Sequence, residues 1–443
     1  QNAVQSIKQY YSIMTHRSFY RKVLGDKVKE KKYINNKIVI KNKRDSTGKI
    51  IRDKPTDVIT ELDNTLAIFD EVHGMTQNGA GEAIQLIAKN SVNLKILAMS
   101  ATPMINFADE IIEILNYLRP FEDQIEKSKV FSGTELDMKF KPDGEEYFRQ
   151  KIRGYVSYLR GAEPLTFAKR IDNGITPSSL QLLKIVQCFP SKFQLETYNS
   201  IVDSEITTDS LDIQSSSAAN FSFPGLTKNL KELHGYCGIK GIRTIREQLK
   251  NNRTKLCDLI NSHFNLGLSK EEANDLIYLV NNNKTIYGNI FKQKYIGNFS
   301  CKMEKLLNDI SEFVDDKKGC GPLFIYSNVV KTGIDLVETT FLVNGYLKYQ
   351  EDGNYIVEDN TRCYCCNEEF IAHAGKQHKF YPAIFMKVTG QDDTTELPEQ
   401  NIKIINEVLN NIDNSRGKNI KFILGSKVMG ESFTLKNCKA SFM

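Results

Sequence analysis

The sequence predicts an α/β protein with two parallel-sheet units, and three of its features carry this expectation. Short continuous apolar runs recur along the chain, as in strands that are buried on both faces of a parallel sheet. Amphipathic helical patterns alternate with these runs in two separate regions, which favours strand–helix–strand units. A mostly helical stretch with polar breaks lies between the two regions and predicts a helical insertion.

The first unit is expected within residues 1–120. Apolar runs at 66–69 and 94–99 predict two strands, and each run is followed by a helical pattern, at 81–90 and 107–118. The order strand, helix, strand, helix predicts that the two strands pair in parallel, because the first helix carries the chain back to the edge where the first strand began.

A basic segment lies upstream of these strands. The net charge of the 443 residues is only +5, but Arg21 to Lys54 carries 13 basic and four acidic residues, a local charge of +9. Apolar residues on both sides of Asp45–Gly48 predict a hairpin or a loosely ordered basic loop, preceded by a helix that contains Phe19. Two interpretations stay open for this charge: a solvated face, or a surface that contacts nucleic-acid phosphates.

The middle of the chain is expected to join the two units. Residues 121–187 have an irregular pattern and are interpreted as a linker or extension. Residues 188–300 are predicted to form the helical insertion. Within them, the Ser- and Thr-rich stretch 203–220 has few large apolar residues and predicts a mobile loop.

The α/β pattern returns in residues 301–443. Strands are expected at 323–326, 383–388 and 420–424, and helices at 302–314, 329–344 and 401–410. Asp352-Gly353, between the apolar runs 347–349 and 355–357, predicts a hairpin.

The composition agrees with a folded chain and excludes two other classes. An apolar fraction of 40% is enough for buried cores, which excludes global disorder. No apolar run approaches the ~20 residues that a membrane span needs, and we see no secretory leader. Six of the nine cysteines are scattered, which favours a reducing intracellular compartment over a disulfide framework.

An acidic pair follows the first predicted strand, in the run Asp70-Glu71-Val72-His73. Ligands of open α/β sheets bind beyond the carboxyl ends of strands, which is where these side chains lie. An aspartate there can hold the Mg²⁺ of a nucleotide, and a neighbouring glutamate can orient and deprotonate the attacking water. Four such residues also occur together by chance.

Ser100-Ala101-Thr102-Pro103 follows the second predicted strand. Small hydroxyl side chains at this strand end can hydrogen-bond to the acidic run and respond to the state of the nucleotide. A strand with DEVH followed by a strand with SATP, in this order, argues against a chance match for either motif.

With both motifs in place, the chain resembles superfamily 2 helicases of the DExH type and, through Ser100 to Asn106 followed by Glu110-Ile111, their Swi/Snf-like branch. Three further strings are similar to helicases of large nucleocytoplasmic DNA viruses, including the ATPase of poxvirus early transcription factors. These strings are Thr15–Phe19, Gly154–Gly161 with Phe167, and Phe324–Asn328 with Gly333. The resemblance implies two RecA-like domains: the C-terminal part of one in 1–120, and an incomplete second in 301–443.

The resemblance also implies roles for individual residues. Asp70 and Glu71 would bind Mg²⁺–ATP and, with His73, hydrolyse it, while Ser100 and Thr102 would couple hydrolysis to movement. It implies a nucleic-acid-contacting set in the second RecA-like domain, which comprises Ser327, Asn328, Gly425, Ser426, Lys427 and Glu431.

Two parts of this family's machinery have no counterpart in the sequence. No G-x-x-x-x-G-K-[ST] phosphate loop is present, since Gly48-Lys49 and Gly417-Lys418 lack the partner glycine and the following hydroxyl. The family's arginine-finger motif is absent as well. We therefore expect these residues to be the middle of a larger ATPase that is active at full length and inactive as this segment.

A third constellation is a Cys/His cluster, Cys363-x2-Cys366-x6-His373-x4-His378, in the segment 358–380. Two thiolates and two imidazoles at close spacing suit a tetrahedral structural zinc site. Cys365 is an alternative ligand to Cys366. The other interpretation is a group of unrelated thiols beside two surface histidines.

The leading expectation is an ATP-dependent helicase or translocase of a large DNA virus that acts in transcription or replication, with DNA favoured over RNA. Two alternatives stay open: a transcription-factor subunit that binds promoter DNA and uses ATPase for remodelling or release, and a scaffold without ATPase activity. The implied cofactors are ATP, Mg²⁺ and structural Zn²⁺, and the implied partners are viral RNA polymerase or transcription factors, with no membrane. The implied location is the host cytoplasm, in a viral factory, or the virion.

Overall fold

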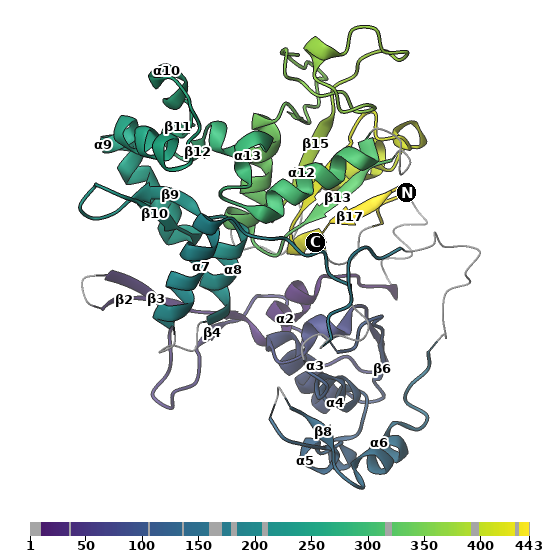
Figure 1. The fold of residues 1–443 in the computed structure, drawn as a ribbon. Coiled ribbons are helices and arrows are strands. Elements are labelled where there is room, and N and C mark those ends of the chain that lie inside the picture. Colours follow the sequence, from purple (N-terminus) through teal and green to yellow (C-terminus); the bar gives the residue numbers. More distant parts are fainter. Residues whose placement is uncertain are drawn as a thin grey trace. The chain divides into compact units, whose positions relative to one another are not determined.

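A computed structural model describes residues 10–34, 37–104, 107–134, 137–158, 171–178, 184–205, 211–314, 321–390, 398–429 and 434–442. The chain divides into two compact units, residues 1–169 and 170–443 (Figure 1). The division falls inside the stretch 121–187 that the sequence suggests as a linker or extension.

The first unit contains the predicted strand–helix–strand–helix order. Strands β5 (Leu66–Phe69) and β6 (Lys95–Ala98) pair in parallel, and helix α3 (Gly79–Asn90) connects them. Helix α4 (Glu110–Tyr117) follows and ends before Pro120. The alternation of apolar runs and helical patterns therefore predicted this part of the fold correctly.

The two strands are not buried on both faces, which corrects the expectation from their apolar runs. One face carries Phe69 and packs into a core with Phe19 and Ile84. On the other face Leu66 and Ile68 are 58% and 54% exposed, because no layer of the described residues covers it. The continuous apolar runs predicted the two strands correctly, but the expectation that both faces of these strands are buried was wrong.

The basic segment forms hairpins, but the one expected around Asp45–Gly48 is reduced to a turn with a single β-bridge between Arg44 and Ile50, because residues 38–40 pair with an earlier strand. Helix α2 (His16–Leu24) leads into β1 (Asp26–Lys27), which pairs with β4 (Arg52–Asp53). Between them, β2 (Lys29–Ile34) and β3 (Lys37–Asn42) form an antiparallel pair.

The stretch that follows α4 has more regular structure than its irregular pattern predicted. It contains α5 (Lys127–Val130), an antiparallel pair of β7 (Phe131–Ser132) and β8 (Lys139–Phe140), and α6 (Gly144–Ile152). These elements are two to nine residues long, which is too short for a sequence period to be read.

The second unit is organised around a five-stranded, fully parallel sheet. Its strands, in spatial order, are β14 (Leu347–Lys348), β15 (Ile384–Val388), β16 (Phe422–Gly425), β13 (Leu323–Tyr326) and β17 (Ala440–Phe442). Three of them were predicted, whereas β17 has only three residues and gave no detectable pattern.

Helices cover both faces of this sheet. On one face, α12 (Cys301–Val314) and α13 (Asp335–Val343) share a core with Phe422 and Leu424 of β16. On the other, Ile423 packs with α14 (Glu399–Ile404) and the π-helical turn Ile405–Leu409. Alternate residues of one strand thus face opposite layers, as expected in a parallel sheet.

The hairpin expected around Asp352-Gly353 does not form. A turn is present, with the Gly353 N–H donating to the Gln350 carbonyl at 3.2 Å, but residues 355–357 form no strand. Strand β14 instead pairs in parallel with β15, which is distant in sequence. The turn residues Asp352-Gly353 contain no information on β15, which pairs with β14 in place of residues 355–357.

The predicted insertion is largely helical but also contains two hairpins. Its elements are α7 (Lys192–Glu205), α8 (Leu211–Asn220), β9 (Phe223–Leu226), β10 (Leu233–Tyr236), α9 (Gly238–His263), α10 (Lys270–Ala273), β11 (Tyr278–Val280), β12 (Thr285–Tyr287) and α11 (Gln293–Ile296). The polar break at Asn251-Asn252 is a kink inside α9, where Asn252 leaves helical geometry.

The stretch 203–220, predicted to be a mobile loop, is helical wherever the structure describes it. Its end is fixed by polar contacts: the Gln194 amide donates to the carbonyls of Ala218 and Ala219, and Ser300 donates to the Asn220 carbonyl at 2.6 Å. These partners lie far away in the sequence, so composition could not predict them.

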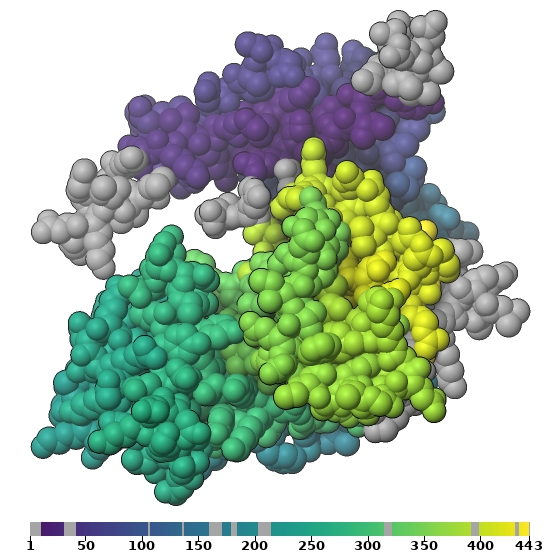
Figure 2. Space-filling view, turned by 90° about the horizontal axis from the view of Figure 1, so that it is seen from above, coloured from purple at the N-terminus to yellow at the C-terminus, as the bar shows by residue number. Residues whose placement is uncertain are grey.

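The insertion and the sheet share one hydrophobic core. Phe221 and Phe299 from the insertion belong to the same buried cluster as Phe341 of α13 and Phe422 of β16. In the space-filling view, the teal-to-green insertion and the green-to-yellow sheet region form one continuous body (Figure 2). The insertion is therefore an integral part of the second unit and not a separate module.

Candidate functional site

The acidic pair lies directly after β5, at the carboxyl edge of the parallel pair. Glu71 has a left-handed backbone conformation, with φ of 49°, and its N–H donates to the Asp70 carboxylate at 3.0 Å. A non-glycine residue in this region stores backbone strain, and such strain clusters at functional sites. Glu71 is the N-cap of the 3₁₀ turn Val72–Met75 that follows it.

His73 connects the first motif to the second. Its ring is buried, with only 4% of the residue exposed. Its Nδ1 lies 2.7 Å from the Ser100 Oγ and 3.3 Å from a Glu71 carboxylate oxygen. The Ser100 hydroxyl also accepts the Thr102 N–H at 3.0 Å. The DEVH and SAT motifs therefore form one continuous polar network.

The parallel pairing of β5 and β6 brings the two motifs together. The Met99 N–H donates to the Phe69 carbonyl at 2.8 Å, and the Val72 N–H donates to the Met99 carbonyl at 3.1 Å. The ladder thus continues past both strand ends and fixes the acidic run against Ser100. The two strand ends meet at one edge, as the sequence predicted.

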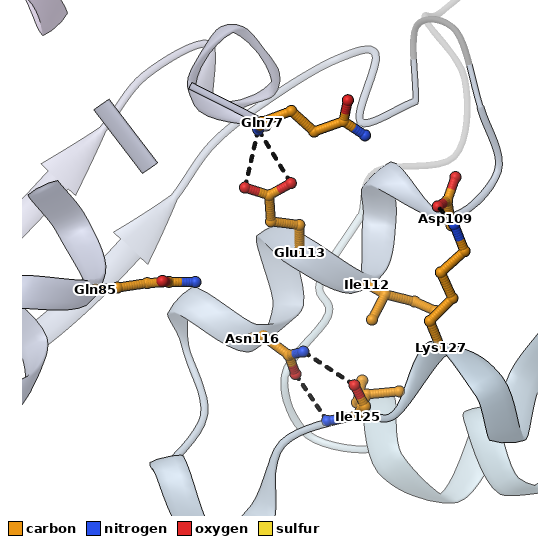
Figure 3. A pocket seen from close by; sticks show the side chains of 8 residues that line it. All are labelled: Gln77, Gln85, Asp109, Ile112, Glu113, Asn116, Ile125 and Lys127. Atoms are coloured by element: carbon orange, nitrogen blue, oxygen red, sulfur yellow. Dashed lines mark hydrogen bonds and ion pairs between the residues drawn. The ribbon is translucent and has the colours of Figure 1, made fainter. Parts of the chain in front are cut away.

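Helix α4 contacts the chain just after the turn that contains His73. The residues that make this contact were missed by the sequence analysis. Both carboxylate oxygens of Glu113 accept the Gln77 N–H, at 2.9 and 3.0 Å. Figure 3 shows this contact at a pocket of about 240 Å³. Tyr117 donates to Glu113 at 2.6 Å, and burial together with this carboxylate raises the pKa of Tyr117. Helix α4 also contains the polar residues Glu110 and Asn116, so its sequence does not single out Glu113 as the support of this turn.

The candidate nucleic-acid residues of the second unit lie at the carboxyl ends of β13 and β16. These strands pair up to Tyr326 and Gly425, and the Ser327 N–H donates to the Gly425 carbonyl at 3.1 Å. Asn328 and Lys427 are exposed at this edge. The edge therefore presents one amide and one ammonium group to solvent.

Not all of the expected contacts are placed for binding. Ser426 is only 2% exposed, so it supports the local backbone in this conformation and does not face a ligand. Gly425 is also buried, and a Cβ there would come within 2.5 Å of the Phe324 ring. Glu431, the last residue of the set, lies outside the described residues.

The four predicted zinc ligands converge. One donor atom from each of Cys363, Cys366, His373 and His378 lies within 4.8 Å of the others. The Nε2 atoms of the two histidines are 3.1 Å apart, and the Cys363 Sγ is 3.5 Å from the His378 Nε2. Cys365 is not a member of this group.

Burial is the main cause of the pKa shifts of two members of this Cys/His cluster, Cys366 and His373. It raises the pKa of Cys366 to about 11, with a smaller contribution from the neighbouring Cys363. Burial and the adjacent His378 lower the pKa of His373. At neutral pH the imidazole of His373 is therefore neutral, the form that ligates metals.

The comparisons with known proteins agree with the resemblance to viral helicases. No protein-family model matches the chain. It is 45% identical over 455 residues to a putative ATP-dependent RNA helicase of Acanthamoeba polyphaga mimivirus, an alignment that covers 100% of this chain and 39% of the relative. The whole of this chain thus aligns with part of a viral protein that is named as a helicase.

Two more distant relatives extend this pattern. The chain is 24% identical over 407 residues to the early transcription factor 70 kDa subunit of Melanoplus sanguinipes entomopoxvirus, covering 89% of this chain and 51% of the relative. It is 24% identical over 389 residues to a putative helicase of Invertebrate iridescent virus 3, covering 86% of this chain and 31% of that protein. The chain spans about half or less of the length of these relatives.

None of the helices in the described part of the chain has the length and hydropathy that a membrane span requires.

Proposed function

We propose that this chain is the central part of an ATP-dependent nucleic-acid motor, a helicase or translocase of a large DNA virus. The observation that carries the proposal is the network of Glu71, His73 and Ser100, because it links a pair of strand-end carboxylates to the next strand end. The names of the mimivirus and iridescent-virus relatives support the same class of activity.

Each residue of the network has a distinct proposed role. The exposed Asp70 carboxylate would hold Mg²⁺ on the nucleotide phosphates, since hard carboxylate oxygens suit this ion. Glu71 would orient the attacking water and take its proton. His73 holds the Glu71 side chain in place and passes any displacement to Ser100, and through it to the Thr102 backbone.

The nucleic-acid face is proposed at the carboxyl edge of the second unit. Lys427 would contact backbone phosphate and Asn328 a phosphate or sugar oxygen, which gives binding that tolerates sequence and depends on salt. The exposed Lys41, Lys43 and Arg44 of the basic segment offer further phosphate contacts.

The second candidate function is a transcription-factor subunit that binds promoter DNA and uses ATPase for remodelling or release without unwinding. The similarity to the poxvirus early transcription factor subunit favours it, since that alignment covers 89% of this chain. Both functions use the same ATPase site, so they differ in what the hydrolysis moves.

One set of assays on the full-length protein separates these functions. A motor is expected to hydrolyse ATP faster with nucleic acid present and to displace a strand or a bound roadblock protein in an ATP-dependent way. DNA and RNA duplexes, compared side by side, identify the track. ATP-dependent release of promoter DNA without either displacement would support the second candidate. No hydrolysis with any nucleic acid would leave the scaffold alternative and contradict the proposal.

A further inference from the structure

The connection between β14 and β15 is unusual for a parallel pair. Parallel neighbours need a long crossover, which an α-helix usually provides. Here residues 349–383, all of which the structure describes, contain no α-helix, and their one helical element is the short 3₁₀ turn Phe370–Ala372. The Cys/His cluster lies within this crossover.

The crossover has almost no hydrophobic core of its own. Among residues 350–382, Cys363 is the only apolar residue in the buried set, and the aromatic Phe370 is 45% exposed. A segment that buries so little apolar surface cannot offset the entropy of ordering its backbone. Interactions other than apolar burial must therefore hold this segment in its conformation.

The Cys363 end of the cluster is held by residues that flank the strands of the sheet. The Arg362 N–H donates to the Gly345 carbonyl at 2.9 Å, and the Ala383 N–H donates to the Arg362 carbonyl at 2.7 Å. Cys363 forms a β-bridge with Pro382, next to the start of β15. The two cysteines of the cluster lie in the turn 363–366, here called the knuckle, which these contacts hold. The two histidines lie in the loop that follows it.

The backbone of the knuckle is built for two neighbouring thiolates. The Asn367 N–H donates to the Cys363 carbonyl at 3.0 Å, and the Cys363 N–H donates to the Glu368 carbonyl at 2.9 Å. Asn367 has a φ of 58°, which closes the turn directly after Cys366. The turn brings the first and fourth residues of the knuckle to the same side, while Cys365 stays out of the group.

We propose that Cys363, Cys366, His373 and His378 bind one structural zinc ion that takes the place of a crossover helix between β14 and β15. Tetrahedral bonds of about 2.0–2.3 Å place neighbouring donor atoms ~3.3–3.8 Å apart. The observed separations of 3.1 and 3.5 Å are close to this spacing. Two sulfurs and two imidazoles in this arrangement favour zinc over harder cations.

The ion is structural and not catalytic. All four positions of a tetrahedral ion are taken by protein donors, so none is left for water or substrate. Two thiolates also neutralise the charge of Zn²⁺, which suits a site where Cys363 is fully buried. The inference does not depend on the proposed motor function.

Metal analysis and Co²⁺ substitution of the purified chain test this proposal. About one zinc per chain is expected, and the Co²⁺ form should show tetrahedral ligand-field bands with charge transfer from two thiolates. Cys363→Ser and His378→Ala should each reduce the bound metal to less than about a tenth of wild type. Cys365→Ser, the matched control, should leave metal content and spectrum unchanged.

Limited proteolysis separates the role of the metal from a general folding defect. Chelation of the wild-type chain should expose residues 349–383 to cleavage, while the first unit, residues 1–169, stays resistant. Zinc should restore protection. A wild-type chain that holds no metal and takes up neither Zn²⁺ nor Co²⁺ would overturn the proposal. Loss of metal in Cys365→Ser, with metal kept in Cys366→Ser, would overturn the ligand set.

Discussion

The Nδ1 atom of His73 lies 2.7 Å from the Oγ atom of Ser100, so the last residue of the DEVH motif contacts the first residue of the SAT motif. The same imidazole nitrogen lies 3.3 Å from Glu71. A change at the carboxylate can therefore reach the second strand end through one ring, which is what coupling between hydrolysis and movement requires.

The first prediction concerns Ser100. Ser100→Ala removes the hydroxyl that contacts His73 and accepts the Thr102 N–H, while Asp70 and Glu71 keep their positions. In the full-length protein we expect ATP turnover to stay within about ten-fold of wild type, while strand displacement or translocation falls much further. Thr102→Ala, which keeps the backbone N–H, should have a smaller effect. Parallel loss of both activities in Ser100→Ala would indicate a folding defect and leave coupling unsupported.

A second prediction tests the nucleic-acid face through Lys427. If its ammonium group contacts one phosphate, Lys427→Gln should weaken binding of all sequences similarly and reduce the slope of log K against log[salt] by about one. Lys418→Gln is the matched control, because Lys418 is also exposed but precedes β16 instead of following it. An unchanged slope for Lys427→Gln, or an equal change for Lys418→Gln, would contradict the assignment of this edge.

A third prediction concerns acid stability of the second unit. Lys387 of β15 contacts Asp335 at 2.6 Å and Glu338 at 2.7 Å, and Lys348 of β14 contacts Glu338 at 2.7 Å. Burial alone would raise the pKa of Glu338, but the two ammonium groups together lower it below the usual value. The carboxylate therefore stabilises the folded state above its unfolded pKa, and this stability is lost as the pH falls through the folded pKa.

Glu338→Gln removes this charge and leaves a hydrogen-bonding side chain. We expect it to cost about 1.5–3 kcal/mol at neutral pH, the usual range for hydrogen bonds to charged groups. Urea unfolding at a series of pH values from neutral to acid provides the measurement. The difference between wild type and variant should shrink below the ordinary pKa of a glutamate. A difference that stays constant down to acid pH would contradict the account.

The strands that carry the candidate sites could be predicted because their signal is local. Runs such as Leu66–Phe69 and Leu323–Tyr326 combine continuous apolar character with polar residues at one end, and the chemistry lies at that end. The convergence of the Cys/His cluster was also predictable, because its four residues lie close together in the sequence.

The features that were missed depend on partners far away in the chain. Glu113 supports the turn at Gln77 across 36 residues, and Ser300 fixes the end of α8 across 80. Strand β14 pairs with β15 and not with the nearby residues 355–357. Local patterns contain no information on such contacts, so the exposed face of β5, the missing hairpin and the ordered α8 all differed from expectation.

The most direct test of the proposed ATPase site is Glu71→Gln in the full-length protein. The amide keeps the size of the side chain but cannot take a proton from water, so ATP turnover should fall by ~10²-fold or more while ATP binding is retained. Asp70→Ala should instead weaken Mg²⁺-dependent nucleotide binding. Glu61→Gln, an exposed glutamate of the same unit, is the control and should behave as wild type. Turnover of Glu71→Gln within about two-fold of wild type would contradict the assignment of Glu71 as the residue that activates water.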